Sequence, residues 1–283
     1  MNKPFFLNST FLKILAMIII LIDHVGYFLV SPFGDTETLY WLLRGIGRLG
    51  FPLYAFFIVE GIIHSRNIKN YLLKILALAL VISAFQVLSL YSPLSQYFYI
   101  GEAYNVFLTL FVGGLTVAYF HQKKYRRIYM LIPLLVLIIT NISALYIEGD
   151  WQILLVNEYR IYGLVMIFGF YLAYALTPKV RAYLVANYQA PHEGINTPQY
   201  TQKINNYLSC ISLLFVNLLW YILSVTIAIV PFDGFQTYSI FTAILILVYN
   251  GEKGYQPVWF RWVYYLFYPA HLALLAVISL LIS

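Results

Sequence analysis

Residues 11–30, FLKILAMIIILIDHVGYFLV, form an almost uninterrupted apolar run near the start of a 283-residue chain. At a rise of 1.5 Å per residue, about 20 apolar residues let a helix cross the hydrocarbon of a bilayer. The run is longer than the roughly 7 to 15 apolar residues of a secretory signal, and no A-x-A-like cleavage site follows it. We therefore expect it to stay in the mature protein as a membrane-spanning helix.

The composition extends this interpretation to the whole chain. Hydrophobic residues make up 62% of the sequence and charged residues only 10%, whereas a soluble domain carries about 25% charged residues. The single cysteine, Cys210, lies in an apolar run, so neither an intrachain disulfide nor a cysteine-based metal site is possible. We expect an integral membrane protein in which the net charge of +6 belongs to loops beside the bilayer and not to a nucleic-acid site.

The apolar runs are continuous and do not alternate with polar residues, which excludes a β-barrel. The sequence therefore predicts an all-α, polytopic helix bundle that forms one domain over residues 1–283, with a cytoplasmic loop at about 178–206. It predicts nine spans, at roughly 11–30, 47–64, 71–90, 103–120, 128–147, 161–177, 207–230, 236–250 and 263–282.

The basic residues orient this bundle. If the N-terminus is inside, only Arg44, Arg48 and Arg160 of the 17 lysines and arginines fall outside. Cytoplasmic loops carry the excess of lysine and arginine, so the distribution predicts an inside N-terminus and an outside C-terminus.

Asp23 and His24 are adjacent ionisable residues within the first span. An ionisable residue at the centre of a span costs roughly 2.5 to 3.5 kcal/mol on insertion scales, so each needs a partner, a wet cavity or a function. A buried imidazole beside a carboxylate is oriented and accepts a proton near neutral pH. The alternative is a hydrogen bond between helices that only stabilises the bundle.

The second span carries cations at its predicted outer end and Glu60 with His64 at its inner end. Arg48 is the predicted partner of Asp23, since this pairing offsets the cost of burying both charges. For Arg44 the alternative is that its side chain reaches the membrane interface. Gly47 in the same segment allows a neighbouring helix to approach closely.

Two further segments hold candidate residues. Asn105 begins the fourth span as a helix cap or a donor to another helix. The stretch YNGEKG, residues 249–254, is typical of a helix end followed by a tight loop. Pro269 is expected to kink the last span just before His271. A kink beside an imidazole at membrane depth indicates either a cavity or simple helix packing.

Together these residues resemble the TraX family, which is named for the membrane protein that N-acetylates F-type conjugative pilin. The patterns GR-x-x-FP-x-x-AF-x-x-VEG and FY-x-x-H are the most specific part of the similarity. The matching segments are LKILAMIIILIDHVG, RGIGRLGFPLYAFFIVEGIIHSRN, NVFLTL, YNGEKG and WVYYLFYPAHLALL. The family in turn resembles membrane acyltransferases that use acyl-CoA, in which a histidine near the end of the first span is essential, and this role falls on His24.

The resemblance implies an acetyltransferase of a bacterial inner membrane, with acetyl-CoA as donor and a pilin or other exported peptide as acceptor. Its catalytic residues would be His24 and Asp23. The predicted substrate-binding residues are Arg44, Arg48, Glu60, His64, Asn105, Tyr249, Asn250, Lys253 and His271. The predicted basic rim for the CoA phosphates comprises Arg66, Lys69, Lys123, Lys124, Arg126, Arg127 and Lys253.

Other functions stay open at this point. An O-acetyltransferase of a surface glycan or lipid-linked sugar uses the same chemistry with a hydroxyl acceptor. A proton-coupled transporter also carries acids and histidines within its spans, and a membrane scaffold would need none of them for chemistry. The chain contains no H-E-x-x-H or P-loop pattern, and we expect no metal ion.

Overall fold

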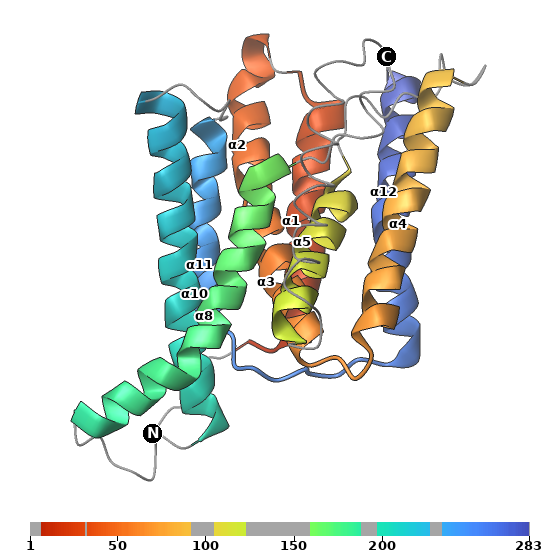
Figure 1. Ribbon diagram of the computed structural model, residues 1–283. Helices are drawn as coiled ribbons and strands as arrows, with labels where there is room; N and C mark the ends of the chain where they lie inside the picture. Colours follow the sequence, from red (N-terminus) through yellow and green to blue (C-terminus); the bar gives the residue numbers. More distant parts are fainter. Residues whose placement is uncertain are drawn as a thin grey trace.

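The computed structural model describes residues 7–31, 33–91, 105–122, 159–187, 197–226 and 234–282. Within these residues every regular element is helical, and the single β-bridge, between Leu7 and Tyr249, is isolated. The predicted all-α class is therefore confirmed for the described part of the chain. Figure 1 shows a bundle of long helices that run roughly side by side.

Six helical segments in the described residues are long and apolar enough to span a membrane, and the chain is a multi-pass membrane protein. They are Ser9–Leu29, Gly34–Ile63, Ile68–Gln86, Arg160–Asn187, Pro198–Ser224 and Trp262–Ile282. Two shorter apolar helices, Val106–His121 and Phe235–Leu247, match the predicted fourth and eighth spans. The predicted span at 128–147 lies outside the described residues, so the count of nine and the orientation of the bundle stay predictions.

The first three helices form a tight antiparallel unit. Helix α1 (Ser9–Leu29) begins at Asn8, whose side chain accepts a hydrogen bond from the backbone N–H of Phe11. After a short 3-10 turn, η1 (Gly34–Thr36), helix α2 (Glu37–Gly47) packs against α1, and α3 (Gly50–Ile63) follows it. The sequence analysis predicted that the second span begins at residue 47. This is wrong, because the apolar helical segment begins at Gly34, and Arg48 lies near its middle.

The remaining helices complete the bundle. They are α4 (Ile68–Tyr91), α5 (Val106–His121), α8 (Arg160–Asn187), α10 (Pro198–Tyr221) with a π-helical turn at Ile222–Thr226, the 3-10 helix η4 (Gly234–Phe241), α11 (Thr242–Leu247) and α12 (Val258–Ile282). Helices α4, α5, α8 and α11 are among those that contact α3.

The predicted loop at 178–206 is too long. Residues up to Asn187 continue α8, and residues from Pro198 already belong to α10. Figure 1 shows α8 bending away from the bundle toward its C-terminal end, and Pro178 lies inside this helix. A proline within a helix removes a hydrogen bond and bends it, so a polar, proline-containing stretch is helical here even though it resembles a loop.

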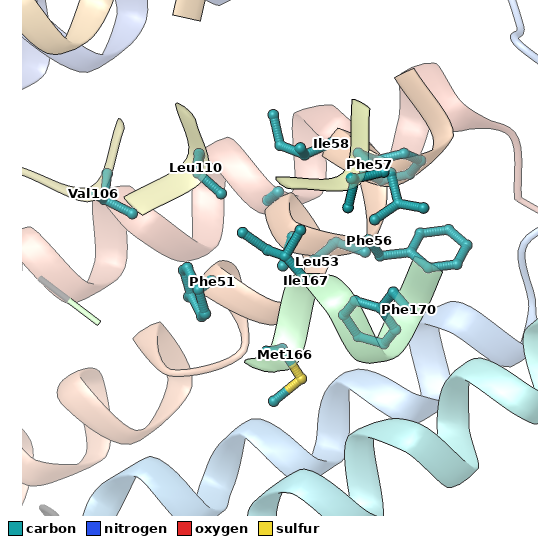
Figure 2. Packing of buried hydrophobic residues seen from close by; sticks show 14 of the residues in the cluster. Phe51, Leu53, Phe56, Phe57, Ile58, Val106, Leu110, Met166, Ile167 and Phe170 are labelled. Atoms are coloured by element: carbon teal, nitrogen blue, oxygen red, sulfur yellow. The ribbon is translucent and has the colours of Figure 1, made fainter. Parts of the chain in front are cut away.

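Helix α3 is the centre of the bundle. In the segment Gly34–Ile63, which contains α3, 67% of the most apolar 18-residue stretch is buried. The corresponding share is 28% in α1 and in the last span. Figure 2 shows Phe56 and Leu53 of α3 packing against Phe170 and Met166 of α8, with Leu110 of α5 nearby. This core fixes α3, and therefore the residues before and after it, relative to α1 and α12.

Candidate functional site

The centre of the candidate site is a pair of histidines from opposite ends of the chain. Nδ1 of His24 on α1 lies 2.6 Å from Nε2 of His271 on α12. The two imidazole planes are inclined by only 16°, with ring centres 4.9 Å apart. This is the arrangement of two rings joined edge to edge by one hydrogen bond.

The surroundings of His271 determine which nitrogen carries the proton. Its Nδ1 lies 2.7 Å from the backbone carbonyl oxygen of Phe267, which can only accept a hydrogen bond. When both rings are neutral, Nδ1–H of His271 donates to that carbonyl and Nε2 of His271 must accept. Nδ1–H of His24 is then the donor between the rings, and Nε2 of His24 keeps a free lone pair.

Helix α12 places His271 by means of its own backbone. Pro269 lies inside α12, as the sequence predicts, and His271 is buried with 6% of its surface exposed. The ring of Tyr268 packs edge-on against both imidazoles, with centres 5.7 Å from His24 and 5.3 Å from His271. The histidine pair is therefore held between a backbone carbonyl and an aromatic wall.

Asp23 has a different partner from the one predicted. Its Oδ2 accepts a hydrogen bond from Nη1 of Arg44 at 2.6 Å, and both side chains are only 15% exposed. The expectations that Arg48 forms this pair and that Arg44 extends to the interface are therefore wrong. Arg48 still interacts electrostatically with Asp23 from the link between α2 and α3. Because α2 runs antiparallel to α1, Arg44, which lies one helical turn before Arg48, faces Asp23.

Gly47 makes this arrangement possible. A Cβ atom added to Gly47 would collide with the side chain of Asp23. The missing side chain therefore lets α2 approach α1 closely enough for the carboxylate to reach the arginine, as the sequence predicted for this glycine.

His24 and Asp23 line a cleft of about 440 Å³, a volume that includes its open mouth. The walls come from α1, α3, α5 and α12 and are largely aromatic, with Phe51, Tyr54 and Tyr268 among them. An apolar cleft with a few convergent polar groups is the usual form of a small-molecule site. The imidazole of His24 therefore borders this cleft.

A second polar cluster lies at the other end of α1. Glu60 of α3, 8% exposed, accepts hydrogen bonds from the Tyr249 hydroxyl and, at 3.4 Å, from Nδ2 of Asn205. Nδ1 of His64 lies 3.5 Å from its carboxylate, and Lys13 interacts with it electrostatically. Lys13 and His24 are eleven residues apart on α1, so the two sites are separated by roughly 16 Å along the helix.

The YNGEKG loop closes this end of the bundle. Residues 7–10 pair with it through backbone bonds such as Ser9 N–H to the Glu252 carbonyl at 2.8 Å. Gly251 and Gly254 adopt φ angles of +79° and +73°, which confirms the predicted tight loop. Asn250 uses its side chain to bond Glu252 within the loop.

The structure thus divides the predicted site residues. His24, Asp23, Arg44 and His271 come together, with Arg48 close to Asp23. Those at the opposite end of α1 are Glu60, His64, Tyr249, Asn250 and Lys253. Asn105 caps α5 and donates to the Ala79 carbonyl of α4 at 2.7 Å, which confirms both of its predicted structural roles.

Sequence reasoning missed the tyrosines of the site. Of the 27 tyrosines it named only Tyr249 as a site residue, and most of the others suit the membrane interfaces, whereas Tyr54, Tyr159 and Tyr268 line the cleft. A signal was present for Tyr268, which precedes His271 by three residues and therefore shares its helix face. Tyr54 carries no such local signal, because its position depends on how α3 packs.

The fold and the cleft define a class of protein: a multi-pass membrane protein with a histidine pair beside an interior cleft. The chain belongs to the TraX family, described as TraX protein, which matches residues 8–279. It is 27% identical over 275 residues to a protein of Dichelobacter nodosus described as "Probable fimbrial assembly protein FimC, serogroup H1", covering 93% of this chain and 92% of that protein. No solved structure is significantly similar to the chain.

Proposed function

We propose that this protein is a membrane-embedded acetyltransferase that moves an acetyl group from acetyl-CoA to an amine. The observation that supports it best is the orientation of the histidine pair, which leaves Nε2 of His24 as a free base. A base must lie within hydrogen-bond reach of the proton that it removes. His24 borders a cleft from which an acceptor would approach it.

The donor would approach from the end of the bundle that carries Lys13 and Lys253. Arg66 lies in the short connection between α3 and α4 and Lys69 in the first turn of α4, both at the same end, because α3 finishes there beside Glu60. Four other basic residues of the predicted rim lie outside the described residues. By the positive-inside rule this end faces the cytoplasm of an inner membrane, where acetyl-CoA is made. The pantetheine arm of acetyl-CoA would extend from the basic rim into the bundle as far as His24.

The chemistry needs one base at the cleft. An α-amine has a pKa of about 7.7 to 8.0, so it arrives largely protonated at neutral pH and must lose a proton to attack. His24 takes this proton on Nε2, and the amine nitrogen bonds to the thioester carbonyl carbon. The carbon–sulfur bond then breaks, and the second amine proton goes to the sulfur to give CoA-SH. Direct transfer and an acetyl-His24 intermediate both use the same free nitrogen.

The other residues around the cleft have supporting roles in this proposal. His271 orients His24, a role that the sequence analysis predicted for Asp23. The Asp23–Arg44 pair places a neutralised charge beside the base, and Arg48 remains a candidate for stabilising the thioester oxyanion. Tyr249 and Asn250, which were predicted to bind substrate, lie in the other cluster and are better suited to the donor's end.

The acceptor proposed is the N-terminus of a pilin or another exported peptide. The relative from Dichelobacter nodosus is described as a probable fimbrial assembly protein, which supports a filament subunit as acceptor. A hydroxyl acceptor on a glycan would use the same base but would differ in its proton balance. Acetylation of a protonated amine releases one proton per CoA, whereas acetylation of a hydroxyl releases none.

The test is to incubate the purified protein in detergent with labelled acetyl-CoA and pilin N-terminal peptides. The thiol of CoA is measured with a disulfide reagent, a workable assay because the only cysteine of the chain, Cys210, is buried. Label in the peptide with one proton released per CoA supports the amine acceptor. Label in a glycan with no net proton supports the hydroxyl acceptor. Folded protein that neither binds acetyl-CoA nor releases CoA would disprove the enzyme, and uptake of a solute without a donor would indicate a transporter.

A further inference from the structure

Buried tyrosine hydroxyls that the proposed reaction has not used lie between the two polar clusters. Tyr54 lines the cleft beside His24 and forms a side-chain hydrogen bond with Tyr264 of α12. Their rings are inclined by 33° with centres 6.1 Å apart. The Tyr54 hydroxyl in the cleft is thus linked to the Tyr264 hydroxyl outside it.

The same series continues toward the Glu60 cluster. Tyr264 interacts electrostatically with the hydroxyl of Tyr71 on α4. That hydroxyl lies against the backbone of α3 at Gly61, where an added Cβ atom would collide with it. Gly61 directly follows Glu60, so the absence of a side chain brings the Tyr71 hydroxyl beside the segment that holds the carboxylate.

Lys13 borders the far end of this series. Its Nζ lies 6.0 Å from the ring centre of Tyr264 and 5.3 Å from that of Phe57. Its charge interacts with both Glu60 and Lys253. Glu60 in turn contacts His64, which is 65% exposed and therefore reaches solvent.

The spacing of the helices agrees with a continuous path. Tyr54 and Gly61 are seven residues apart on α3, and Tyr264 and His271 are seven apart on α12, each about 10 Å along its helix. The hydroxyls therefore lie at depths between the histidine pair and the Glu60 end of α3.

We infer that Tyr54, Tyr264 and Tyr71 form a proton path from the cleft at His24 to the Glu60 cluster. The inference rests on the proposed acetyl transfer, which leaves one proton on Nε2 of His24 each time a protonated amine is acetylated. That proton passes through cleft water to the Tyr54 hydroxyl while Tyr54 passes its own proton to Tyr264. The last hydroxyl gives a proton to Glu60 or His64, and each tyrosine ends the step protonated as it began.

The test compares wild type with Tyr264→Phe and Tyr54→Phe, which remove one hydroxyl each and keep the ring. We expect kcat to fall about 10- to 10²-fold, up to the lower end of what a positioned proton-transfer group contributes. The KM for acetyl-CoA is expected to stay unchanged. The solvent deuterium isotope effect on kcat is expected to rise, because proton departure becomes rate-limiting. Added imidazole, a small proton acceptor that enters the cleft, is expected to restore much of the rate.

Tyr171→Phe is the matched control, since Tyr171 of α8 packs against Phe168 and lies outside the path. It is expected to show neither the loss nor the rescue. Tyr71→Phe provides a third position should one of the other variants be unstable in detergent.

The outcomes separate this inference from the proposed function. Wild type that releases CoA, together with folded variants that keep their kcat or lose it without rescue by imidazole, would overturn the path alone. Wild type that releases no CoA would remove the source of the proton, and both the function and the path would be rejected.

Discussion

The two ends of α1 hold their ionisable groups in different ways. Beside the cleft, Asp23 has a single close cationic partner, Arg44 at 2.6 Å, and His24 has a single imidazole partner at the same distance. At the other end, Glu60 is surrounded by Tyr249, Asn205, His64 and Lys13, with Asn205 at 3.4 Å and His64 at 3.5 Å.

This difference indicates different tasks. A charge with one short contact is fixed in position, which a catalytic base and its neighbours require. A carboxylate with several longer contacts tolerates gain or loss of a proton and the arrival of a charged ligand. The comparison teaches that acids and histidines within spans need not do the same work, even on one bundle.

The largest expected effect is on the cleft side. His24→Ala is expected to lower kcat by about 10²- to 10⁴-fold, which is what a positioned general base contributes. CoA release with the peptide acceptor measures it. His121→Ala, at the end of α5, is the control and should leave kcat near the wild-type value. A His24→Ala protein that folds and keeps its rate would show that the cleft histidine only joins helices.

The next effect concerns stability. Arg44→Met leaves Asp23 with its charge buried and its closest cation removed, which is expected to cost about 3 to 5 kcal/mol of unfolding free energy. Unfolding in mixed micelles measures it, and Arg44→Met combined with Asp23→Asn should recover part of the loss. Glu60→Gln, at the other end of α1, is expected to cost less, because Gln keeps the shape and can still bond Tyr249. Equal losses at both ends would contradict the distinction drawn between them.

A smaller effect is expected at the glycines. Gly47→Ala inserts a methyl group against Asp23 and is expected to cost about 1 to 3 kcal/mol through overpacking. It should also reduce activity, because it separates α2 from α1 beside the base. Gly251→Ala forces an alanine into a positive φ and is expected to cost roughly 1 to 2 kcal/mol. The informative measurement is kcat at a temperature where both variants are folded, since only the Gly47 variant should be slow.

The smallest effect is expected at the exposed rim. Lys253→Ala removes one exposed charge, which is worth about 0.2 to 1 kcal/mol, and should raise the KM for acetyl-CoA by about 2- to 5-fold. Its kcat should not change, because the interaction would be equal in the ground and transition states. Raising the salt concentration should have a similar effect on wild type. A change in kcat with constant KM would place Lys253 in the chemistry instead of donor binding.

Much of the fold was predictable because hydropathy alone determines which segments prefer lipid. The predicted first span, residues 11–30, differs from α1 by only a few residues at either end. The errors in the predicted spans occur where polar residues lie inside a helix and not at its end. Arg44 and Arg48 suggested the end of a span, although the helical segment continues from Gly34 to Ile63 with its arginines inside. Residues 178–187 suggested a loop because polar helical surface and polar loop have similar composition.

The sequence by itself determined the class of protein and the family resemblance, and it singled out His24 as a candidate, because these depend on local composition and on short patterns. The tertiary structure decided which groups meet. His24 and His271 are 247 residues apart in the chain, and no local pattern specifies that one ring donates to the other. Arg44 and not Arg48 reaches Asp23 for the same reason. The choice depends on the packing of α2 against α1 at Gly47, and packing between helices is a property of the whole fold.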